Sequence, residues 1–177
     1  MITARGVAGL HDHQERGAVV LDLDGVLADT RHRMHHLTGR RKDWDGFFAA
    51  AVDDPAHPEG LAVAREALAR GSTVIYLSGR PEHLRRDTVD WLRSVDAPDG
   101  ELLLRPEGDR RPARLVKVEA LRRLADRYRL DVLVDDDPDV VDAVRSARPP
   151  LVAQVLLADW QPRQATLHEA QERDGRT

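Results

Sequence analysis

Short apolar runs recur through the middle of the chain, and amphipathic segments separate them. Five of these runs are rich in β-branched residues or leucine, and we expect them to form strands at residues 18–23, 73–78, 101–105, 131–136 and 151–157. Apolar residues between them recur at near-helical spacing, which predicts helices at residues 61–70, 83–95, 115–128 and 139–146. Gly71 and Pro149 lie just past two of these helix ends, where both residue types are common.

The alternation of strands and helices predicts the fold class. Several of the strands are nearly continuous apolar runs, which is typical of strands buried on both faces of a parallel sheet. We therefore expect a doubly wound α/β fold, with helices on both faces of a five-stranded parallel sheet. Ligands of such sheets bind at the carboxyl ends of the strands, close to the point where the strand order reverses.

Composition narrows the class of protein further. The 177 residues suit one domain, and 41% of them are hydrophobic, which is typical of a globular chain. No apolar run approaches the roughly 20 residues that span a bilayer, so we expect no membrane segment. The chain has no cysteine, and its first residues carry charge in place of the apolar run of a signal peptide, so we expect a cytoplasmic location.

Both ends of the chain differ from its middle. Residues 1–16 and 163–177 are polar and lack apolar periodicity, so we expect poorly ordered tails on either side of a domain at 17–162. Residues 31–58 break the alternation of strands and helices and are rich in basic and aromatic side chains. We interpret this segment as a small cap that is inserted over the carboxyl end of the first strand.

Polar side chains follow four of the predicted strands. In chain order they are Asp22 and Asp24, then Ser78, Gly79 and Arg80, then Arg105, and finally Asp135, Asp136 and Asp137. Because the carboxyl ends of parallel strands meet at one edge of a sheet, we expect these side chains to converge on one crevice.

The acidic residues of this crevice predict a metal ion. Like charges a few ångströms apart are unstable in a medium of low dielectric unless a cation neutralises them or one carboxyl is protonated. An all-oxygen cluster in a chain without cysteine suits Mg²⁺, whose octahedral shell typically includes water and phosphate oxygens. A carboxylate beside Mg²⁺ can attack phosphorus and form an aspartyl-phosphate, and a second carboxyl two residues on can supply and remove protons.

The run Asp-Leu-Asp-Gly-Val-Leu-Ala-Asp at residues 22–29 closes the first predicted strand, and through it the chain resembles the haloacid dehalogenase superfamily of phosphatases. The resemblance extends over residues 19–161 and includes all four superfamily motifs. It implies a Rossmann-like three-layer core with strand order 5-4-1-2-3. Within the superfamily the chain looks most like the phosphatase domain of bacteriophage polynucleotide kinase-phosphatases, although its sequence has no G-x-x-x-x-G-K-[ST] loop of a kinase half.

The resemblance implies a role for each residue of the crevice. Asp22 is expected to be the nucleophile, and Asp24 the general acid/base. The Ser78 hydroxyl and the Gly79 amide are expected to bind phosphoryl oxygens. Arg80 and Arg105 are expected to contact the substrate phosphate, and Lys117 the transferring group. The implied ligands of Mg²⁺ are Asp22, the backbone carbonyl of Asp24, Asp135 and Asp136, with Asp139 as a weaker candidate.

The predicted cap has two interpretations. Its aromatic residues Trp44, Phe47 and Phe48 could stack on bases, with Trp44 facing the crevice, or they could pack as a small amphipathic helix on the body. Its basic run at residues 31–42 could attract polyanions or form a solvated charged face. The net charge of −4 argues against a protein that coats nucleic acid, but it leaves room for a local basic patch.

These observations predict a Mg²⁺-dependent phosphomonoesterase that acts through a phosphoenzyme at Asp22. Because a cap of about 30 residues covers the site only in part, we expect 3'-phosphate or cyclic-phosphate nucleic-acid ends, or nucleotides, as substrates. A phosphatase of mononucleotides or other small metabolites is the alternative enzyme. A phosphate-binding or partner-docking domain is the alternative that is not an enzyme. The sequence predicts no oligomeric state.

Overall fold

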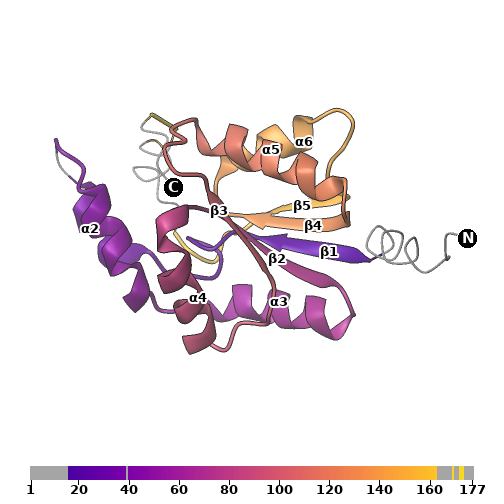
Figure 1. Ribbon diagram of the computed structural model, residues 1–177, viewed down its shortest axis with the longest axis horizontal. Helices are drawn as coiled ribbons and strands as arrows, with labels where there is room; N and C mark the ends of the chain where they lie inside the picture. The colour runs from indigo at the N-terminus through magenta and orange to yellow at the C-terminus, as the bar shows by residue number, and fades with distance from the viewer. Residues whose placement is uncertain (1–15, 39, 163–168, 170–171, 174–177) are drawn as a thin grey trace, which may run out of the picture.

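The computed structural model describes residues 16–38, 40–162, 169 and 172–173 (Figure 1). Residues 1–15 and most of 163–177, for which we expected poorly ordered tails, lie outside the described residues. Within the described part of the chain, no helix is long and apolar enough to cross a membrane.

A five-stranded parallel sheet forms the centre of the fold. Its strands are β1 (Gly17–Leu21), β2 (Thr73–Pro81), β3 (Glu101–Arg105), β4 (Arg129–Asp135) and β5 (Gln154–Leu157). They lie in the order β3-β2-β1-β4-β5, and every neighbouring pair is parallel. This confirms the predicted α/β class and the predicted strand order. The chain steps outward from β1 in both directions, so the crevice expected in such sheets lies at the carboxyl ends of β1 and its two neighbours.

Helices cover both faces of the sheet. They are α3 (Pro58–Ala69) and α4 (Arg85–Ser94) on one face, and α5 (Ala113–Ala125) and α6 (Pro138–Ser146) on the other (Figure 1). Each strand contributes side chains to the core on both faces of the sheet, because successive side chains of a strand point to opposite faces. Val19 and Leu21 of β1 join the core cluster under α3, whereas Ala18 and Val20 join the cluster under α5.

Local sequence explains where the helices begin and end. α3 begins at Pro58, before the predicted Leu61, because proline suits the first turn of a helix. Gly71 follows its C-terminal end with a φ of 78°, a left-handed conformation that costs glycine little. At the start of α6 the Asp137 side chain accepts a hydrogen bond from the Asp139 amide at 2.9 Å and so satisfies one of the free amides of the first turn.

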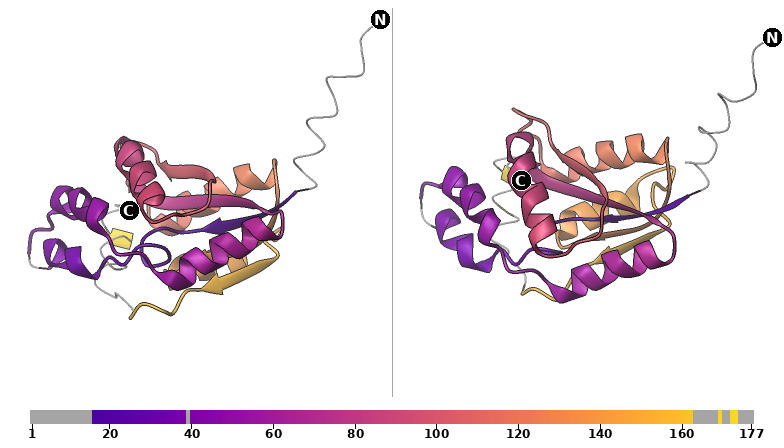
Figure 2. Two further views of the ribbon diagram at one scale, coloured as in Figure 1. Left: turned by 90° about the horizontal axis from the view of Figure 1, so that it is seen from below. Right: turned by 60° about the horizontal axis from the view of Figure 1, so that its bottom comes forward.

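The segment between β1 and α3, which we interpreted as a cap, folds as three short helices. They are the 3-10 helices η1 (Arg31–Leu37) and η2 (Ala50–Asp53) and the helix α2 (Trp44–Ala49). These helices extend beyond the carboxyl ends of the strands, on the left of Figures 1 and 2. They have a small core of their own, formed by Leu37, Trp44, Phe47 and Phe48. The cap therefore lies at the edge of the sheet where the predicted site residues are.

Candidate active site

Two carboxylates and a lysine meet where β1 and β4 end. Asp22 directly follows β1 and Asp135 is the last residue of β4, and these two strands are neighbours in the sheet. Lys117, from α5, places its Nζ atom 2.7 Å from Asp22 Oδ2 and 2.7 Å from Asp135 Oδ2. All three side chains are buried. The structure thus brings together three of the predicted site residues.

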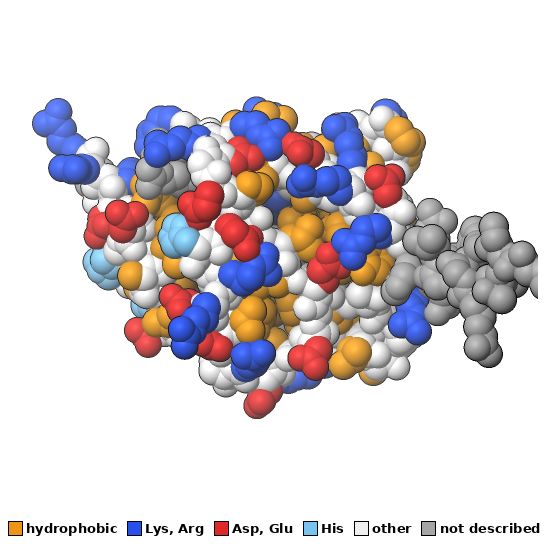
Figure 3. Space-filling model, viewed as in Figure 1, with side chains coloured by type: hydrophobic (Ala, Val, Ile, Leu, Met, Phe, Trp, Pro, Cys, Tyr) orange, Lys and Arg blue, Asp and Glu red, His pale blue; other side chains and the backbone are white. Residues whose placement is uncertain are grey.

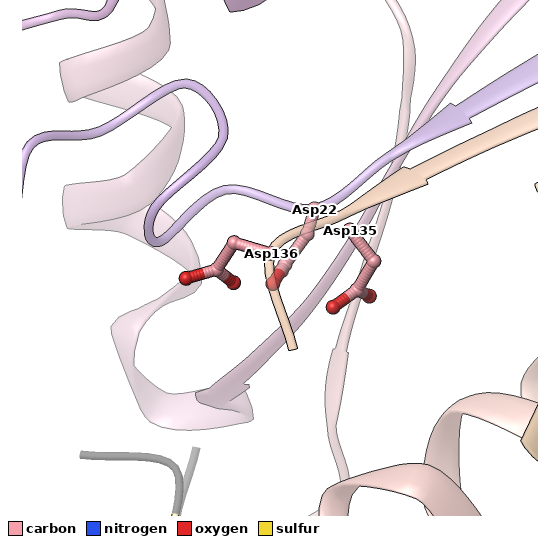
Figure 4. A group of neighbouring side chains, drawn as sticks. All are labelled: Asp22, Asp135 and Asp136. Atoms are coloured by element: carbon pink, nitrogen blue, oxygen red, sulfur yellow. The ribbon is translucent and has the colours of Figure 1, made fainter. Parts of the chain in front are cut away.

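A third carboxylate completes a group that suits a cation. One carboxylate oxygen from each of Asp22, Asp135 and Asp136 lies within 4.8 Å of the other two (Figure 4). Gly25 permits this arrangement, since its φ is 82° and a Cβ atom at this position would lie 2.1 Å from Asp136 Oδ2. Three negatively charged oxygen donors fit a hard divalent cation. Asp139, the weaker candidate, is exposed and does not belong to this group.

Burial makes the acidic group unfavourable without a cation. Burial raises the pKa of Asp22 to about 7, although the charge of Lys117 opposes the increase. Burial also raises the pKa of Asp135 to about 6 against the same lysine. For Lys117, burial favours the neutral amine, but the charges of Asp135 and Asp22 outweigh it and raise the pKa. One lysine offsets only part of the charge of three carboxylates, and a bound cation would offset the rest.

Asp24, the predicted general acid/base, is held by two arginines. Its Oδ1 atom accepts hydrogen bonds from Arg80 Nε at 2.8 Å, from Arg80 Nη2 at 2.6 Å and from Arg33 Nη2 at 2.8 Å. Its Oδ2 atom is buried and has no hydrogen-bond partner among the described residues. Burial favours the neutral carboxyl, but the two guanidinium charges outweigh it and lower the pKa of Asp24 to about 2. Asp24 is therefore ionised in the protein without substrate.

A further carboxylate, Asp54, binds the same two arginines. Arg33 donates from Nε to Asp54 Oδ1 and from Nη2 to Oδ2, each at 2.8 Å, and Arg80 Nη2 donates to Oδ2 at 2.8 Å. We expected Arg80 to bind the substrate phosphate, but in the structure its guanidinium binds Asp24 and Asp54. A phosphate contact by Arg80, which stays a prediction, would require part of these bonds to be exchanged.

Sequence reasoning missed Arg33 and Asp54. Arg33 belongs to the basic run 31–42, and no motif or spacing distinguishes it from its neighbours. Asp54 follows η2 at the end of the cap, again outside any motif. Both side chains are fully buried in the structure. Only the folded cap brings them to Asp24, so the sequence alone had no usable signal for either residue.

The predicted phosphate-binding residues lie at the end of β2. Ser78 is buried, and its Oγ atom accepts a hydrogen bond from the Arg80 amide at 3.2 Å. Arg105, at the end of β3, donates from Nε to the Gly79 carbonyl at 3.3 Å and from Nη1 to the Arg111 carbonyl at 2.8 Å. Burial lowers the pKa of Arg105. Arg105 thus holds the loop that follows β3 against the end of β2, a role that we did not predict.

The structure places Trp44 inside the cap and not in the crevice. Its residue surface is 6% exposed, and its ring packs against Phe47 and Phe48, with centroid distances of 5.8 and 5.9 Å. Because α2 lies beyond the strand ends, its rings have no sheet to cover and bury one another instead. This arrangement agrees with the alternative of a packed cap helix. Phe48, one of the rings that we expected could stack on bases, lines a hollow between α2 and the loop after β3, together with His83 and Arg110.

Several side chains of the basic run 31–42 are paired with carboxylates. The pairs are Arg31–Asp29, His32–Asp54, Arg33–Asp24, Arg33–Asp54 and His36–Asp43. Figure 3 shows basic and acidic side chains interspersed across one face of the molecule, around a hollow lined by hydrophobic side chains. A charged surface of mixed sign describes this face better than a continuous basic patch.

Comparison with known proteins agrees with the geometry. Residues 16–160 match the family of the polynucleotide kinase PNKP phosphatase domain. A chain of the Pnkp1/Rnl/Hen1 RNA repair complex is 28% identical, with a TM-score of 0.66 over 82% of this chain and 44% of that chain. The present chain therefore spans less than half of the length of that protein. No match was found among curated proteins.

Two more distant structures share the fold. The class C acid phosphatase from Bacillus anthracis is 16% identical, with a TM-score of 0.61 over 96% of this chain and 84% of that chain. The haloacid dehalogenase-like protein SP0104 from Streptococcus pneumoniae is 14% identical, with a TM-score of 0.58 over 88% and 91% of the two chains. The family match confirms the resemblance found in the sequence: the chain belongs to the PNKP phosphatase domain family of the haloacid dehalogenase superfamily, and it is a phosphatase domain.

Proposed function

We propose that the protein is a Mg²⁺-dependent phosphomonoesterase that forms an aspartyl-phosphate at Asp22. Its substrates would be 3'-phosphate or cyclic-phosphate ends of nucleic acids, or nucleotides. The observation that carries the proposal is the position of Asp22, which shares the charge of Lys117 with Asp135 beside a third carboxylate, Asp136. Residues 17–162 would form the phosphatase unit, with residues 31–58 as its cap.

The metal would be held by Asp22, Asp135 and Asp136, with the backbone carbonyl of Asp24 as a further ligand. When bound there, Mg²⁺ would supply positive charge that offsets the carboxylates and the phosphate oxygens. Lys117 would stay protonated, because its pKa is raised by Asp135 and Asp22 in spite of burial. It would stabilise negative charge on the transferring group.

In the first step, a carboxylate oxygen of Asp22 forms a bond to phosphorus while the bond from phosphorus to the leaving oxygen breaks. Asp24 gives its proton to that oxygen, which departs as an alcohol. Asp24 must therefore be protonated when the substrate is bound. A phosphate beside Asp24 adds negative charge and competes for Arg80 and Arg33, and both effects raise the pKa of Asp24 from its value of about 2.

In the second step, water attacks the phosphorus of the aspartyl-phosphate. Asp24, now ionised, accepts a proton from this water, and the bond between Asp22 and phosphorus breaks. Inorganic phosphate leaves, and the carboxylate of Asp22 is restored. The same carboxyl thus acts as acid in one step and as base in the next.

The substrate part of the proposal is supported by the similarity to a chain of an RNA repair complex. The mixed charge of the surface in Figure 3 favours the second candidate, a phosphatase of mononucleotides or other small phosphate esters. A long polyanion gains most of its affinity from clustered basic side chains. In the cap, several of these side chains are instead paired with carboxylates.

The test compares turnover of a 3'-phosphorylated oligonucleotide with turnover of nucleoside 3'- and 5'-monophosphates, each with Mg²⁺ and with EDTA. We expect phosphate release only with Mg²⁺, and a kcat/KM for the oligonucleotide at least equal to that for the mononucleotides. Release from mononucleotides alone would support the second candidate. Release from none of these esters would contradict the proposed substrate class.

A further inference from the structure

Asp54 is a buried carboxylate at the point where the cap returns to the body of the protein. Its side chain is fully buried and contacts basic groups from two parts of the fold. Arg33 comes from η1 of the cap, and Arg80 comes from β2 of the body. His32 adds a third contact, with its Nε2 atom 2.8 Å from Asp54 Oδ1. One carboxylate therefore joins the cap to the strand that carries the predicted phosphate-binding residues.

Arg33 and Arg80 each bridge Asp54 and Asp24. Arg33 binds both oxygens of Asp54 through Nε and Nη2, and the same Nη2 lies 2.8 Å from Asp24 Oδ1. Arg80 Nη2 lies 2.8 Å from Asp54 Oδ2 and 2.6 Å from Asp24 Oδ1. The four groups form a closed arrangement in which positive and negative charges alternate. Asp24 is held through Oδ1, while its Oδ2 has no hydrogen-bond partner among the described residues.

Contacts with aromatic rings fix the orientation of the Arg33 and Arg80 guanidinium groups only in part. Arg33 Cζ lies 4.1 Å from the centroid of Phe47, and Arg80 Cζ lies 5.4 Å from that of Trp91. A ring face restrains the plane of a guanidinium but not its rotation within that plane. A carboxylate that accepts several N–H bonds restrains this rotation. Asp54 supplies that restraint, and it adds a second buried negative charge, so that Arg33 and Arg80 do not share the charge of Asp24 alone.

We propose that Asp54 is a positioning residue for proton transfer. Through Arg33 and Arg80 it fixes the orientation of the Asp24 carboxyl, and so directs Asp24 Oδ2 to the leaving oxygen of the phosphate ester. This inference rests on the proposed function, since that function assigns the proton transfer to Asp24. Loss of the Asp54 charge will therefore impair protonation of the leaving group more than it impairs attack by Asp22.

Kinetics with two aryl esters of similar size can separate an effect on protonation of the leaving group from an effect on attack by Asp22. Nitrophenolate departs with little help from a proton, whereas phenolate needs it, so only phenyl phosphate depends strongly on the general acid. We expect Asp54→Asn to lower kcat/KM for phenyl phosphate by about 10- to 100-fold, and for p-nitrophenyl phosphate by less than about 3-fold. A purely structural defect lowers both constants by the same factor, and equal losses would overturn the positioning role.

The matched control is Asp53→Asn, the same chemical change at the exposed neighbouring residue. It should leave kcat/KM for both esters within about 2-fold of the wild type. In the double variant Asp54→Asn with Asp24→Asn, the loss should equal that of Asp24→Asn alone, because Asp54 acts through Asp24. Losses that multiply instead would contradict the inference.

Two outcomes separate this inference from the proposed function. A wild type that hydrolyses neither ester with Mg²⁺ overturns both. A wild type that is active, with equal losses in Asp54→Asn, overturns the positioning role alone. Should Asp54→Asn fail to fold, Asp54→Glu keeps the charge but displaces it by one methylene. We expect the same unequal losses for that variant, and equal losses would again overturn the inference.

Discussion

At the scale of residues, two carboxyl groups separated by a single residue have pKa values shifted in opposite directions. Asp22 shares one lysine with Asp135, and burial raises its pKa to about 7. Asp24 is also buried, but Arg33 and Arg80 lower its pKa to about 2. Leu23, between them, packs into the core cluster under α3. The two carboxyl groups flank this buried leucine just past the end of β1 and have different cationic partners, Lys117 for Asp22 and the two arginines for Asp24.

The first prediction concerns these two carboxyl groups. We expect Asp22→Asn to abolish turnover of p-nitrophenyl phosphate with Mg²⁺, because the amide cannot act as the nucleophile. For phenyl phosphate, whose leaving oxygen needs a proton, Asp24→Asn should lower kcat by about 10²- to 10⁴-fold through the loss of proton transfer. Far-UV circular dichroism should show that both variants keep the fold.

The control for this prediction is Asp29→Asn in the same segment. Asp29 binds Arg31 and contacts none of the three carboxylates that suit a cation, so its substitution should leave turnover within about threefold of the wild type. Near-normal turnover of Asp22→Asn would rule out the aspartyl-phosphate.

At the scale of elements, the cap has a packing core and a separate surface toward the loop after β3. Trp44 belongs to the core, whereas Phe48 contributes to both the core and the hollow beside that loop. Arg105 holds the same loop in place through the carbonyls of Gly79 and Arg111. A change inside the cap and a change at the hollow should therefore have different effects on the enzyme.

The second prediction compares Trp44→Leu with Phe48→Leu. We expect Trp44→Leu to lower the free energy of unfolding by about 1–3 kcal/mol, because it leaves a cavity among the cap rings. It should not change the ratio of kcat/KM for an oligonucleotide to kcat/KM for a mononucleotide. Phe48→Leu should change this ratio, since Phe48 lines the hollow. Urea unfolding and steady-state kinetics measure the two effects.

The two variants serve as controls for each other, because both shorten an aromatic side chain of α2. A selective rise in KM for oligonucleotides in Trp44→Leu would show that Trp44 contacts the substrate after all. It would then favour base stacking by Trp44 over the packed position that the ring has in the structure.

At the scale of the whole molecule, the acidic group links stability to pH and to metal. The pKa values of Asp22 and Asp135, about 7 and about 6, lie above the ordinary value of 3.8 because of burial. The folded protein thus binds these protons more tightly than the unfolded chain does. The stability that results is fully present below about pH 3.8 and is lost as the pH rises through 6 and 7. Asp24 acts in the opposite direction, but only between about pH 2 and 3.8.

The third prediction follows from competition between these protons and a cation. We expect Mg²⁺ to raise the Tm of the protein clearly at pH 8, where Asp22 and Asp135 are ionised, and much less at pH 5. Thermal unfolding with Mg²⁺ and with EDTA at both pH values measures the effect. Asp135→Asn should lose most of the Mg²⁺-dependent increase at pH 8. An equal increase at both pH values would contradict this link.

Much of the fold was predictable because it depends on local patterns. The apolar runs at 73–78 and 101–105 correspond to β2 and β3, and the strand order agrees with the one implied by the resemblance. The short helices of the cap were not predicted individually. Each is too short to show a full apolar period, and the cap rings bury one another instead of covering the sheet.

The sequence by itself determined which segments form the five strands and which carboxylates lie near their carboxyl ends, because strand periodicity and the order of residues after a strand are properties of a short segment. Only the tertiary structure decided that Arg33 and Asp54 surround Asp24, and that Arg80 binds carboxylates. Such partners come from separate elements of the fold. The sequence also does not distinguish a charged side chain that is buried from one that is solvated. The packing of the cap against the body made that choice, since a buried charge must find its partner within the fold.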